Sequence, residues 1–392
     1  MNVSFSCILD LQTNLLNLTP ENYNEVFNKI LSIEGFNSNK LLLLQIINSI
    51  KSIFKINDEK SELSMKLILD LFPYLKNSIS NEWIFHLFPF QDFKTIMFNL
   101  IKAGFISIDF LKSKYSRGSI EYDYYIDPRD DDLKIKGINN NEITVAIRSD
   151  DLIKFQEIME KSNLNLNSNI EYSPFEKFKY INSRPFIIEF TAFFGSINVF
   201  KFLWLRKVRI TPNLPKYAVA GGNCEIIHMI EEVNASFDGC LEVAIEFFQT
   251  DLIKYIHKSL SYEFTTSCLI SSIINYNIKY FLKIIKLNKN INELSKYGFG
   301  NKISALHAAS ENGLIDIVQF LCSIPGIDVN ITTPNLLITP LHMAAGNGHL
   351  DVVKYLCGLE GIKINAEQCI FINFYAHRII YLFFVMEFYL LI

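Results

Sequence analysis

The sequence lacks the patterns that mark a dedicated chemical site. Its seven cysteines are scattered without a C-x-x-C pair, and its seven histidines form no H-E-x-x-H or other zinc pair four positions apart. Neither G-x-S-x-G nor G-x-x-x-x-G-K-[ST] occurs. These absences argue against a zinc enzyme, a serine hydrolase with a nucleophile elbow and a P-loop nucleotide-binding protein. We therefore expect no catalytic residue, no cofactor and no metal.

The chain also lacks a surplus of charge of one sign. It has 37 Lys and Arg against 41 Asp and Glu, a net charge of −4, which gives no signal for binding nucleic acid or an acidic membrane. The one basic cluster is KFLWLRKVR, with Lys201, Arg206, Lys207 and Arg209 around Trp204. Such a cluster can contact phosphates while the indole stacks on a base. The favoured interpretation is structural: cations complement the end of a helix and Trp204 packs in a core.

The beginning of the chain lacks the basic start of a signal peptide. The first apolar run, MNVSFSCILDLQ, is interrupted by Asp10, so we do not expect a secretory leader. Several cysteines fall at positions where a helix is apolar, which predicts buried free thiols in a reducing compartment. Together these features favour a cytoplasmic location.

Two copies of one unit dominate the C-terminal part of the sequence. SALHAASENGLIDIVQFLCSIPGIDVN is followed by TPLHMAAGNGHLDVVKYLCGLEGIKIN, and His307 and His342 lie 35 positions apart. Ser304 and Thr339 are suited to cap a first helix, and a glycine ends it where a left-handed residue is needed. DIVQFL and DVVKYL then predict a second helix with an inward aliphatic stripe.

These blocks resemble the ankyrin repeat, through T-P-L-H-x-A-A, x-x-G-H-x-D-V-V and D-V-N. The second copy is near consensus, whereas the first has Ala305 in place of Pro and Leu314 in place of His. The resemblance implies an all-α fold, an α-solenoid of stacked antiparallel helix pairs. It also implies that His307 and His342 are structural residues that bond backbone groups between repeats.

A degraded form of the same plan precedes the regular copies. Short apolar helices recur from about residue 139, each followed by a break and a second helix that starts on a polar residue. FTAFFGSINVFKFL, KYAVAGGNCEIIHMIE and CLEVAIEFFQTDLIKYI resemble an ankyrin-like domain of unknown function found in large families of unicellular eukaryotes. We expect an N-terminal helical region at 1–130, degenerate helix pairs at 131–300, two regular repeats at 301–366 and an anomalous hydrophobic tail at 367–392.

The N-terminal region shows helical periodicity without a repeat. Thr19 and Pro20 predict a helix start, with further helices at 41–54, 63–75, 83–90 and 93–101. The run YSRGSIEYDYYIDPRDDD at 115–132 interrupts the pattern. Its carboxylates lack the spacing and central glycine of a calcium loop, so we interpret it as a solvated linker.

The tail EQCIFINFYAHRIIYLFFVMEFYLLI departs from the plan of the repeats altogether. Three interpretations of the tail stay open. The first is an out-of-frame or read-through end of a truncated gene, and the second is a membrane-seeking segment interrupted by His377, Arg378 and Glu387. The third is a buried closing helix.

The function that this organisation predicts is non-enzymatic binding of a protein partner by a scaffold. Ankyrin-type surfaces use finger tips and the exposed side of the first helix, so we expect contacts on a concave face. Alternatives are a membrane-tethered scaffold and an enzyme with an unfamiliar site in residues 1–130; no nucleic-acid partner is expected. The predicted contact residues are Asn301, Lys302, Ile303, Glu311, Asn312, Leu336, Ile338, Met343 and Asn347.

Overall fold

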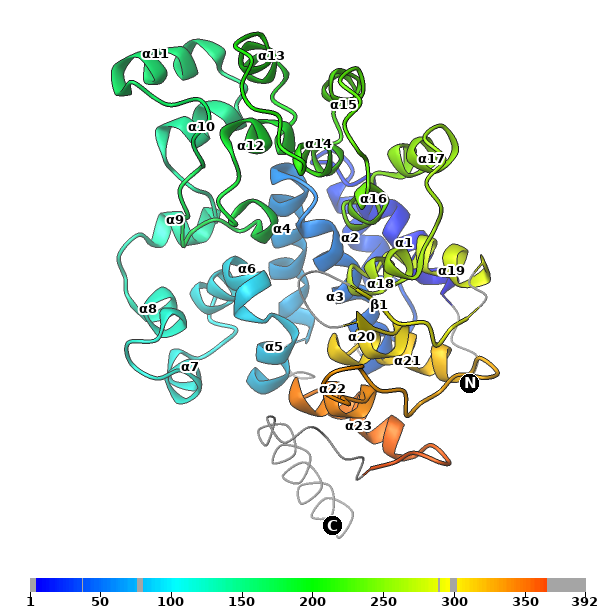
Figure 1. Ribbon diagram of the computed structural model, residues 1–392. Helices are drawn as coiled ribbons and strands as arrows, with labels where there is room; N and C mark the ends of the chain where they lie inside the picture. The colour runs from blue at the N-terminus through cyan, green and yellow to red at the C-terminus, as the bar shows by residue number, and fades with distance from the viewer. Residues whose placement is uncertain (1–4, 37, 76–79, 288–289, 297–301, 365–392) are drawn as a thin grey trace. The chain divides into compact units, whose positions relative to one another are not determined.

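A computed structural model describes residues 5–36, 38–75, 80–287, 290–296 and 302–364. Within them helices are almost the only regular secondary structure, since the strands β1 (Ser295–Lys296) and β2 (Lys302–Ile303) have two residues each (Figure 1). It divides into two compact units, each built from separate stretches of sequence. Unit 1 comprises Met1–Leu16, Asn39–Ser52 and His257–Ile392, and unit 2 comprises Asn17–Ser38 and Ile53–Ile256. The predicted fold class, helix pairs preceded by an N-terminal helical region, is confirmed.

Three consecutive helix pairs form most of unit 1. The first helices of these pairs pack on one another in chain order, and each also packs on its own second helix (Figure 1). Two N-terminal helices complete the unit. The elements are α1 (Ser6–Leu16), α3 (Lys40–Phe54), α18 (Thr266–Ile274), α19 (Ile278–Leu287), β1 (Ser295–Lys296), β2 (Lys302–Ile303), α20 (Ala305–Glu311), α21 (Ile315–Cys322), α22 (Pro340–Gly346) and α23 (Leu350–Cys357).

Apolar spacing explains why the second helices of unit 1 pack as they do. In α19, Ile278, Phe281 and Ile284 recur at three-residue intervals and are buried, while the lysines between them face solvent. The first helices carry small residues instead, such as Ala308 and Ala309 in α20, which are fully buried. Small side chains let neighbouring first helices approach closely, so the pairs stack.

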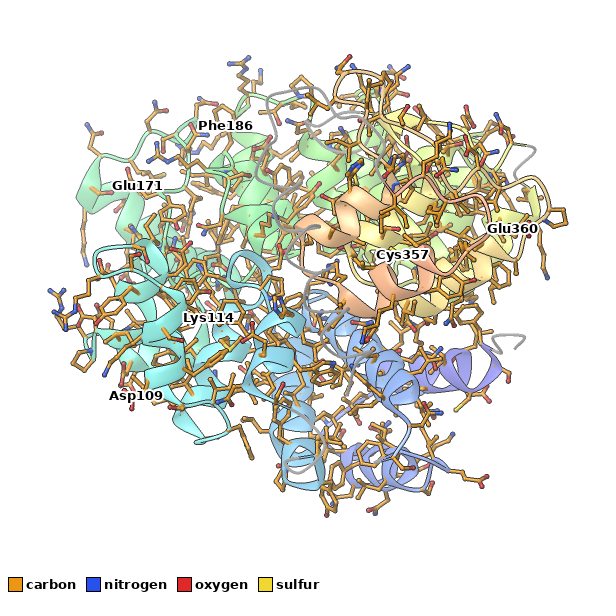
Figure 2. All side chains as sticks on the ribbon, turned by 90° about the horizontal axis from the view of Figure 1, so that it is seen from below. Asp109, Lys114, Glu171, Phe186, Cys357 and Glu360 are labelled. Atoms are coloured by element: carbon orange, nitrogen blue, oxygen red, sulfur yellow. The ribbon has the colours of Figure 1, made fainter. Side chains whose placement is uncertain are left out.

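Unit 2 contains a second set of helix pairs together with the remaining N-terminal helices. Its first helices α10, α12, α14 and α16 also pack in chain order. Asp109 and Lys114 of its α7 are labelled in Figure 2. The elements are α2 (Tyr23–Leu31), α4 (Asp58–Leu75), α5 (Asn81–Leu87), α6 (Phe90–Lys102), α7 (Ile108–Lys114), α8 (Ile120–Ile126), α9 (Asp131–Lys136), α10 (Glu142–Arg148), α11 (Leu152–Ser162), the 3-10 turn η1 (Lys179–Ile181), α12 (Ile187–Phe193), α13 (Ile197–Leu205), α14 (Leu214–Gly221), α15 (Cys224–Glu231), α16 (Cys240–Glu246) and α17 (Thr250–Lys258), which ends in unit 1.

Glycine makes the closest helix contact of unit 2 possible. A Cβ added at Gly221, at the end of α14, would lie 2.3 Å from the carbonyl oxygen of Ala192 in α12. Any side chain there would push the two first helices apart. Gly222 follows with φ of +74° and ends the helix in the left-handed conformation that its alignment with Gly313 and Gly348 predicts.

The N-terminal region corrects two expectations. Helix α2 begins at Tyr23 rather than at Pro20, because Thr19 and Asn22 exchange hydrogen bonds between side chain and backbone and hold the chain in a turn. The run at 115–132 is not a solvated linker. It contains α8, whose Tyr124 and Tyr125 are buried and make edge-on contacts with Phe90.

A buried ion network joins distant parts of unit 2. Arg148, at the end of α10, contacts Asp58 of α4 at 2.6 Å and Glu176 at 2.5 Å. Lys177 contacts Asp58 at 2.9 Å. Burial acts to raise the pKa of Asp58, but the charges of Arg148 and Lys177 outweigh it and lower the pKa. Glu176 is 3% exposed, and Arg148 is the ion-pair partner of its buried carboxylate.

The N-terminal helical region is not one compact body, since its helices are divided between the two units. The boundaries near 130 and 300 come from the repeat pattern in the sequence and stay predictions.

Candidate functional site

The first helix of each regular repeat starts with a capped turn. The Ser304 hydroxyl accepts a hydrogen bond from the backbone N–H of His307, and Thr339 does the same for His342, both at 3.3 Å. In return each imidazole Nδ1 accepts from the backbone N–H of its capping residue. These reciprocal bonds satisfy donors that a helix start otherwise leaves unpaired.

His307 joins two successive repeats. Because Nδ1 accepts from an amide, Nε2 carries the proton, and it donates to the carbonyl oxygen of Ile338 at 2.9 Å. The side chain is fully buried, and burial lowers its pKa to about 4, so the ring is neutral. The expected structural role of His307 is confirmed. His342 makes the same capping bonds within its own repeat.

Asparagine side chains tie each turn between repeats to the next one. Asn292 donates to the Gly326 carbonyl at 2.8 Å and accepts from the Asp328 amide at 2.8 Å. Asn330 repeats both bonds one unit later, to Gly361 and from Lys363. Asn330 thus links its own turn to the turn that follows the next repeat. Asn292 marks a third unit upstream of the two regular copies.

Residues 241–368 match the family model described as ankyrin repeats (3 copies). These are ankyrin repeats. The match begins well before residue 301, so the ankyrin repeats include part of the block that looks degenerate in sequence. The ankyrin-like domain of unknown function, to which about residues 110–366 show a resemblance, is not confirmed. A search of curated proteins finds no match to this chain. Ankyrin repeats are typically non-enzymatic interaction modules, and they indicate a protein partner.

The first finger of the ankyrin repeats is the hairpin of β1 and β2. Ser295 pairs with Ile303 and Lys296 with Lys302 in antiparallel register. Lys302 is exposed, but Ile303 is 7% exposed. The expectation that Ile303 is a solvent-facing tip is therefore wrong, because the next residue, Ser304, begins the buried cap of α20. Asn301 lies outside the residues that the structure describes.

The next finger is a tight loop closed by Thr333. The Thr333 amide donates to the Ile338 carbonyl at 2.9 Å, and the Ile338 amide donates to the Thr333 hydroxyl at 3.1 Å. Leu336 and Ile338 are both partly exposed. Between them Leu337 is 43% exposed and has φ of +51°, a left-handed conformation that L-residues other than Gly, Asn and Asp seldom adopt. Sequence reasoning passed over Leu337, because leucine gives no signal for a positive φ.

The remaining predicted contacts lie along the first helices. Met343 is partly exposed in the middle of α22. Glu311, Asn312 and Asn347 are exposed at the C-terminal ends of α20 and α22, and Asn347 follows Met343 by four residues, about 6 Å along the helix axis. Asn312 and Asn347 each donate to the carbonyl four residues back, at 2.9 Å, so their amides also cap these helix ends.

Helix α3 lies against two successive ankyrin repeats. The Gln45 amide donates to Asp316 at the start of α21 at 3.0 Å, and Lys40 contacts the equivalent Asp351 of α23 at 3.2 Å. Tyr276 also donates to Asp316, at 2.6 Å. Asp316 is 2% exposed, and burial raises the pKa of its carboxyl above the ordinary value.

Helix α1 contacts the repeats through one side chain in the same way. The Gln12 amide donates to the Tyr276 carbonyl at 2.6 Å and accepts from the Ile278 amide at 3.3 Å. Gln12 thereby satisfies backbone groups at the turn between α18 and α19. Helices α1 and α3 are therefore an integral part of the unit that holds the ankyrin repeats.

Two cations of the basic cluster in and after α13 are paired or packed. Lys201 forms an ion pair with Glu225, and the Arg206 guanidinium lies 5.0 Å from the centroid of the Phe202 ring. Trp204 stacks on Phe200. These contacts agree with the structural interpretation, although Trp204 is only partly buried.

Among the residues placed by the structure, no group of three or more His, Cys, Asp or Glu side chains could hold a metal ion. The same part of the chain contains no helix long and apolar enough to cross a membrane. The tail at 367–392, on which three interpretations stay open, lies outside the described residues.

Proposed function

We propose that this chain is a non-enzymatic scaffold that binds a protein partner across the fingers and first helices of its ankyrin repeats. The observation that carries the proposal is Leu337. Its apolar side chain is exposed at a finger, and its backbone is held in a conformation that costs of order 1–3 kcal/mol. Strain of this size at an exposed apolar residue suits a contact that a partner covers.

The exposure and charge of the other candidate contacts define the partner's surface. Lys302 on the first finger is exposed, Met343 of α22 is partly exposed, and Glu311 is exposed at the end of α20. A partner with an apolar anchor at the fingers and polar groups along its length is complementary to this face. The partner-binding residues are thus proposed to be Lys302, Leu337 and Met343, with Glu311 at the rim.

A matched pair of substitutions tests the proposal. Leu337→Asn removes the apolar contact while asparagine tolerates the left-handed backbone, so we expect partner binding to fall and the free energy of unfolding to rise by about 0.5–1 kcal/mol. Leu205→Asn makes the same change at a leucine that is 81% exposed at the end of α13, and should leave binding unaltered. Partners are captured with the full-length protein and quantified by mass spectrometry. If Leu337→Asn retains every partner of the unaltered chain, the binding face lies elsewhere.

A membrane-tethered scaffold is the second candidate, and the apolar sequence of residues 367–392 favours it. Vesicle sedimentation of the full chain and of a chain ending at residue 366 separates the two candidates. Loss of sedimentation on truncation would support the tether, whereas equal behaviour of both chains would remove it. We further propose a cytoplasmic location, which the buried thiol of Cys240 supports, because it forms no disulfide.

A further inference from the structure

A shallow groove of about 480 Å³ runs between α1 and α19 in unit 1. Three leucines line it: Leu9 from α1, and Leu282 and Leu287 from α19. Leu287 is 58% exposed, and the other two are partly exposed. The groove is formed by a second helix of the repeats, so it is separate from the fingers and first helices considered above.

Three lysines of α19 surround this apolar surface. Lys279, Lys283 and Lys286 are all exposed and line the groove, at spacings of four and three residues that place them on one side of the helix. No carboxylate of the described chain forms an ion pair with any of them. The Lys283 ammonium lies 4.8 Å from the centroid of the Phe264 ring and 5.5 Å from that of Tyr280, which holds it at the groove wall.

The position of Lys279 is unfavourable for the helix that carries it. The equivalent residue is Asp316 in α21 and Asp351 in α23, where a carboxylate in the first turn complements the helix dipole. A lysine in the first turn of α19 opposes that dipole. Local departures from what stabilises an element are typical of functional positions.

The second helices of the two regular repeats, α21 and α23, lack this combination of several lysines beside exposed leucines. Helix α21 contains no basic residue, and α23 contains only Lys354. The excess of positive charge beside exposed leucines is therefore a property of α19 rather than of the repeat plan. It needs an explanation other than stacking of the repeats.

We propose that the groove between α1 and α19 is a second docking site, which binds an acidic amphipathic helix of a partner protein. The leucines would take the apolar stripe of that helix, and the three lysines would pair with carboxylates along its edge. Helix α19 has ten residues and is about 15 Å long, which matches two to three turns of a bound helix. Apolar and charged groups together give specificity that either alone would not.

The test uses the full chain and a fluorescently labelled synthetic peptide with leucines on one helical face and glutamates on the other. Reversal of all three charges, Lys279→Glu with Lys283→Glu and Lys286→Glu, should weaken binding at least about tenfold at low ionic strength. Leu287→Ser should weaken it several-fold without changing charge. Lys283→Glu alone should also weaken binding, and its matched control is Lys354→Glu, a single reversal on an exposed lysine of α23 that should leave the affinity unchanged.

Two further probes make each outcome decisive. A peptide of the same composition whose leucines no longer share a face should bind weakly, and equal binding would reduce the effect to non-specific charge attraction. Vesicles containing phosphatidylserine test whether the groove binds a lipid surface instead. The proposal would be overturned if the unaltered chain bound the vesicles but not the peptide, and if the triple variant lost vesicle binding. Leu337→Asn should leave peptide binding intact, which separates this site from the finger face.

Discussion

Removing the carboxylate of Asp316 should destabilise the unit that holds the ankyrin repeats far more than removing its equivalent one repeat later. Asp316→Ala leaves the Tyr276 hydroxyl and the Gln45 amide without their acceptor, and these residues are 2% and 7% exposed. An unmade bond at a buried donor costs about 1–3 kcal/mol. The cost is reduced because burial already disfavours the Asp316 charge. We expect a net loss of about 2–4 kcal/mol.

The control is Asp351→Ala. Its ion pair with Lys40 joins side chains that are 44% and 59% exposed, so its loss should cost less than about 1 kcal/mol. Urea unfolding followed by circular dichroism gives both values. Hydrogen exchange of α3 and α21 localises the effect, since both helices should lose protection in the Asp316 variant. Equal losses in the two variants, or unchanged protection of α3, would refute the docking of α3 on the repeats.

A third variant checks the electrostatic part of this reasoning. Since burial raises the folded-state pKa of Asp316, the folded protein favours the protonated acid. Stability should therefore fall as the pH rises from below the ordinary aspartate value through the raised pKa, and level off above it. Asp316→Asn keeps an acceptor for Tyr276 and Gln45 but cannot ionise, so this decline should disappear. A decline of the same size in the Asn variant would assign it to another group.

Two more predictions concern other buried charges. Arg148→Met should destabilise unit 2 by about 3–5 kcal/mol in urea unfolding, because the buried Glu176 carboxylate loses its ion-pair partner; a Glu176→Gln change added to it should recover part of the loss, and no recovery would contradict the pairing. His307 has a folded-state pKa of about 4, below its ordinary value, so stability should fall by up to about 3 kcal/mol as the pH drops from 6.5 to 4. His307→Asn should remove that fall in thermal unfolding scans at several pH values, and an unchanged profile would assign it to other groups.

Local patterns predicted the repeats well because the relevant interactions are close in sequence. The hydroxyls of Ser304 and Thr339 accept hydrogen bonds from amides only three residues further along the chain. Gly313 ends its helix at φ of +66°, where an added Cβ would lie 2.4 Å from the His349 ring. The second helices also start close to the predicted polar residue: α11 begins directly after it, and α13, α15, α17, α19, α21 and α23 begin one residue before it. The resemblance to ankyrin repeats then supplied the bond that His307 makes to the next repeat.

The features that sequence reasoning missed depend on distant partners or on backbone conformation. Asp316 looks like an ordinary exposed residue at a helix start, but it is buried beside Tyr276, 40 positions away, and Gln45, 271 positions away. Ile303 occupies the position of a finger tip in the repeat, but it is buried because it directly precedes the capped start of α20. Leu337 is exposed and has a positive φ, and neither feature follows from its residue type. The run at 115–132 looked solvated because it contains many carboxylates. The burial of its two tyrosines, Tyr124 and Tyr125, could not be seen from the sequence.

The long separation between α1 or α3 and the helices they contact sets an order of events during synthesis. Gln12 and Tyr276 are 264 positions apart, and Gln45 and Asp316 are 271. A ribosome adding about 5–20 residues per second needs roughly 14–54 s to span the second interval. Throughout that time the apolar sides of α1 and α3 have no repeat to cover them, while residues 53–256 of unit 2 emerge. The nascent chain is therefore exposed to chaperones at its N-terminal helices until the ankyrin repeats leave the exit tunnel.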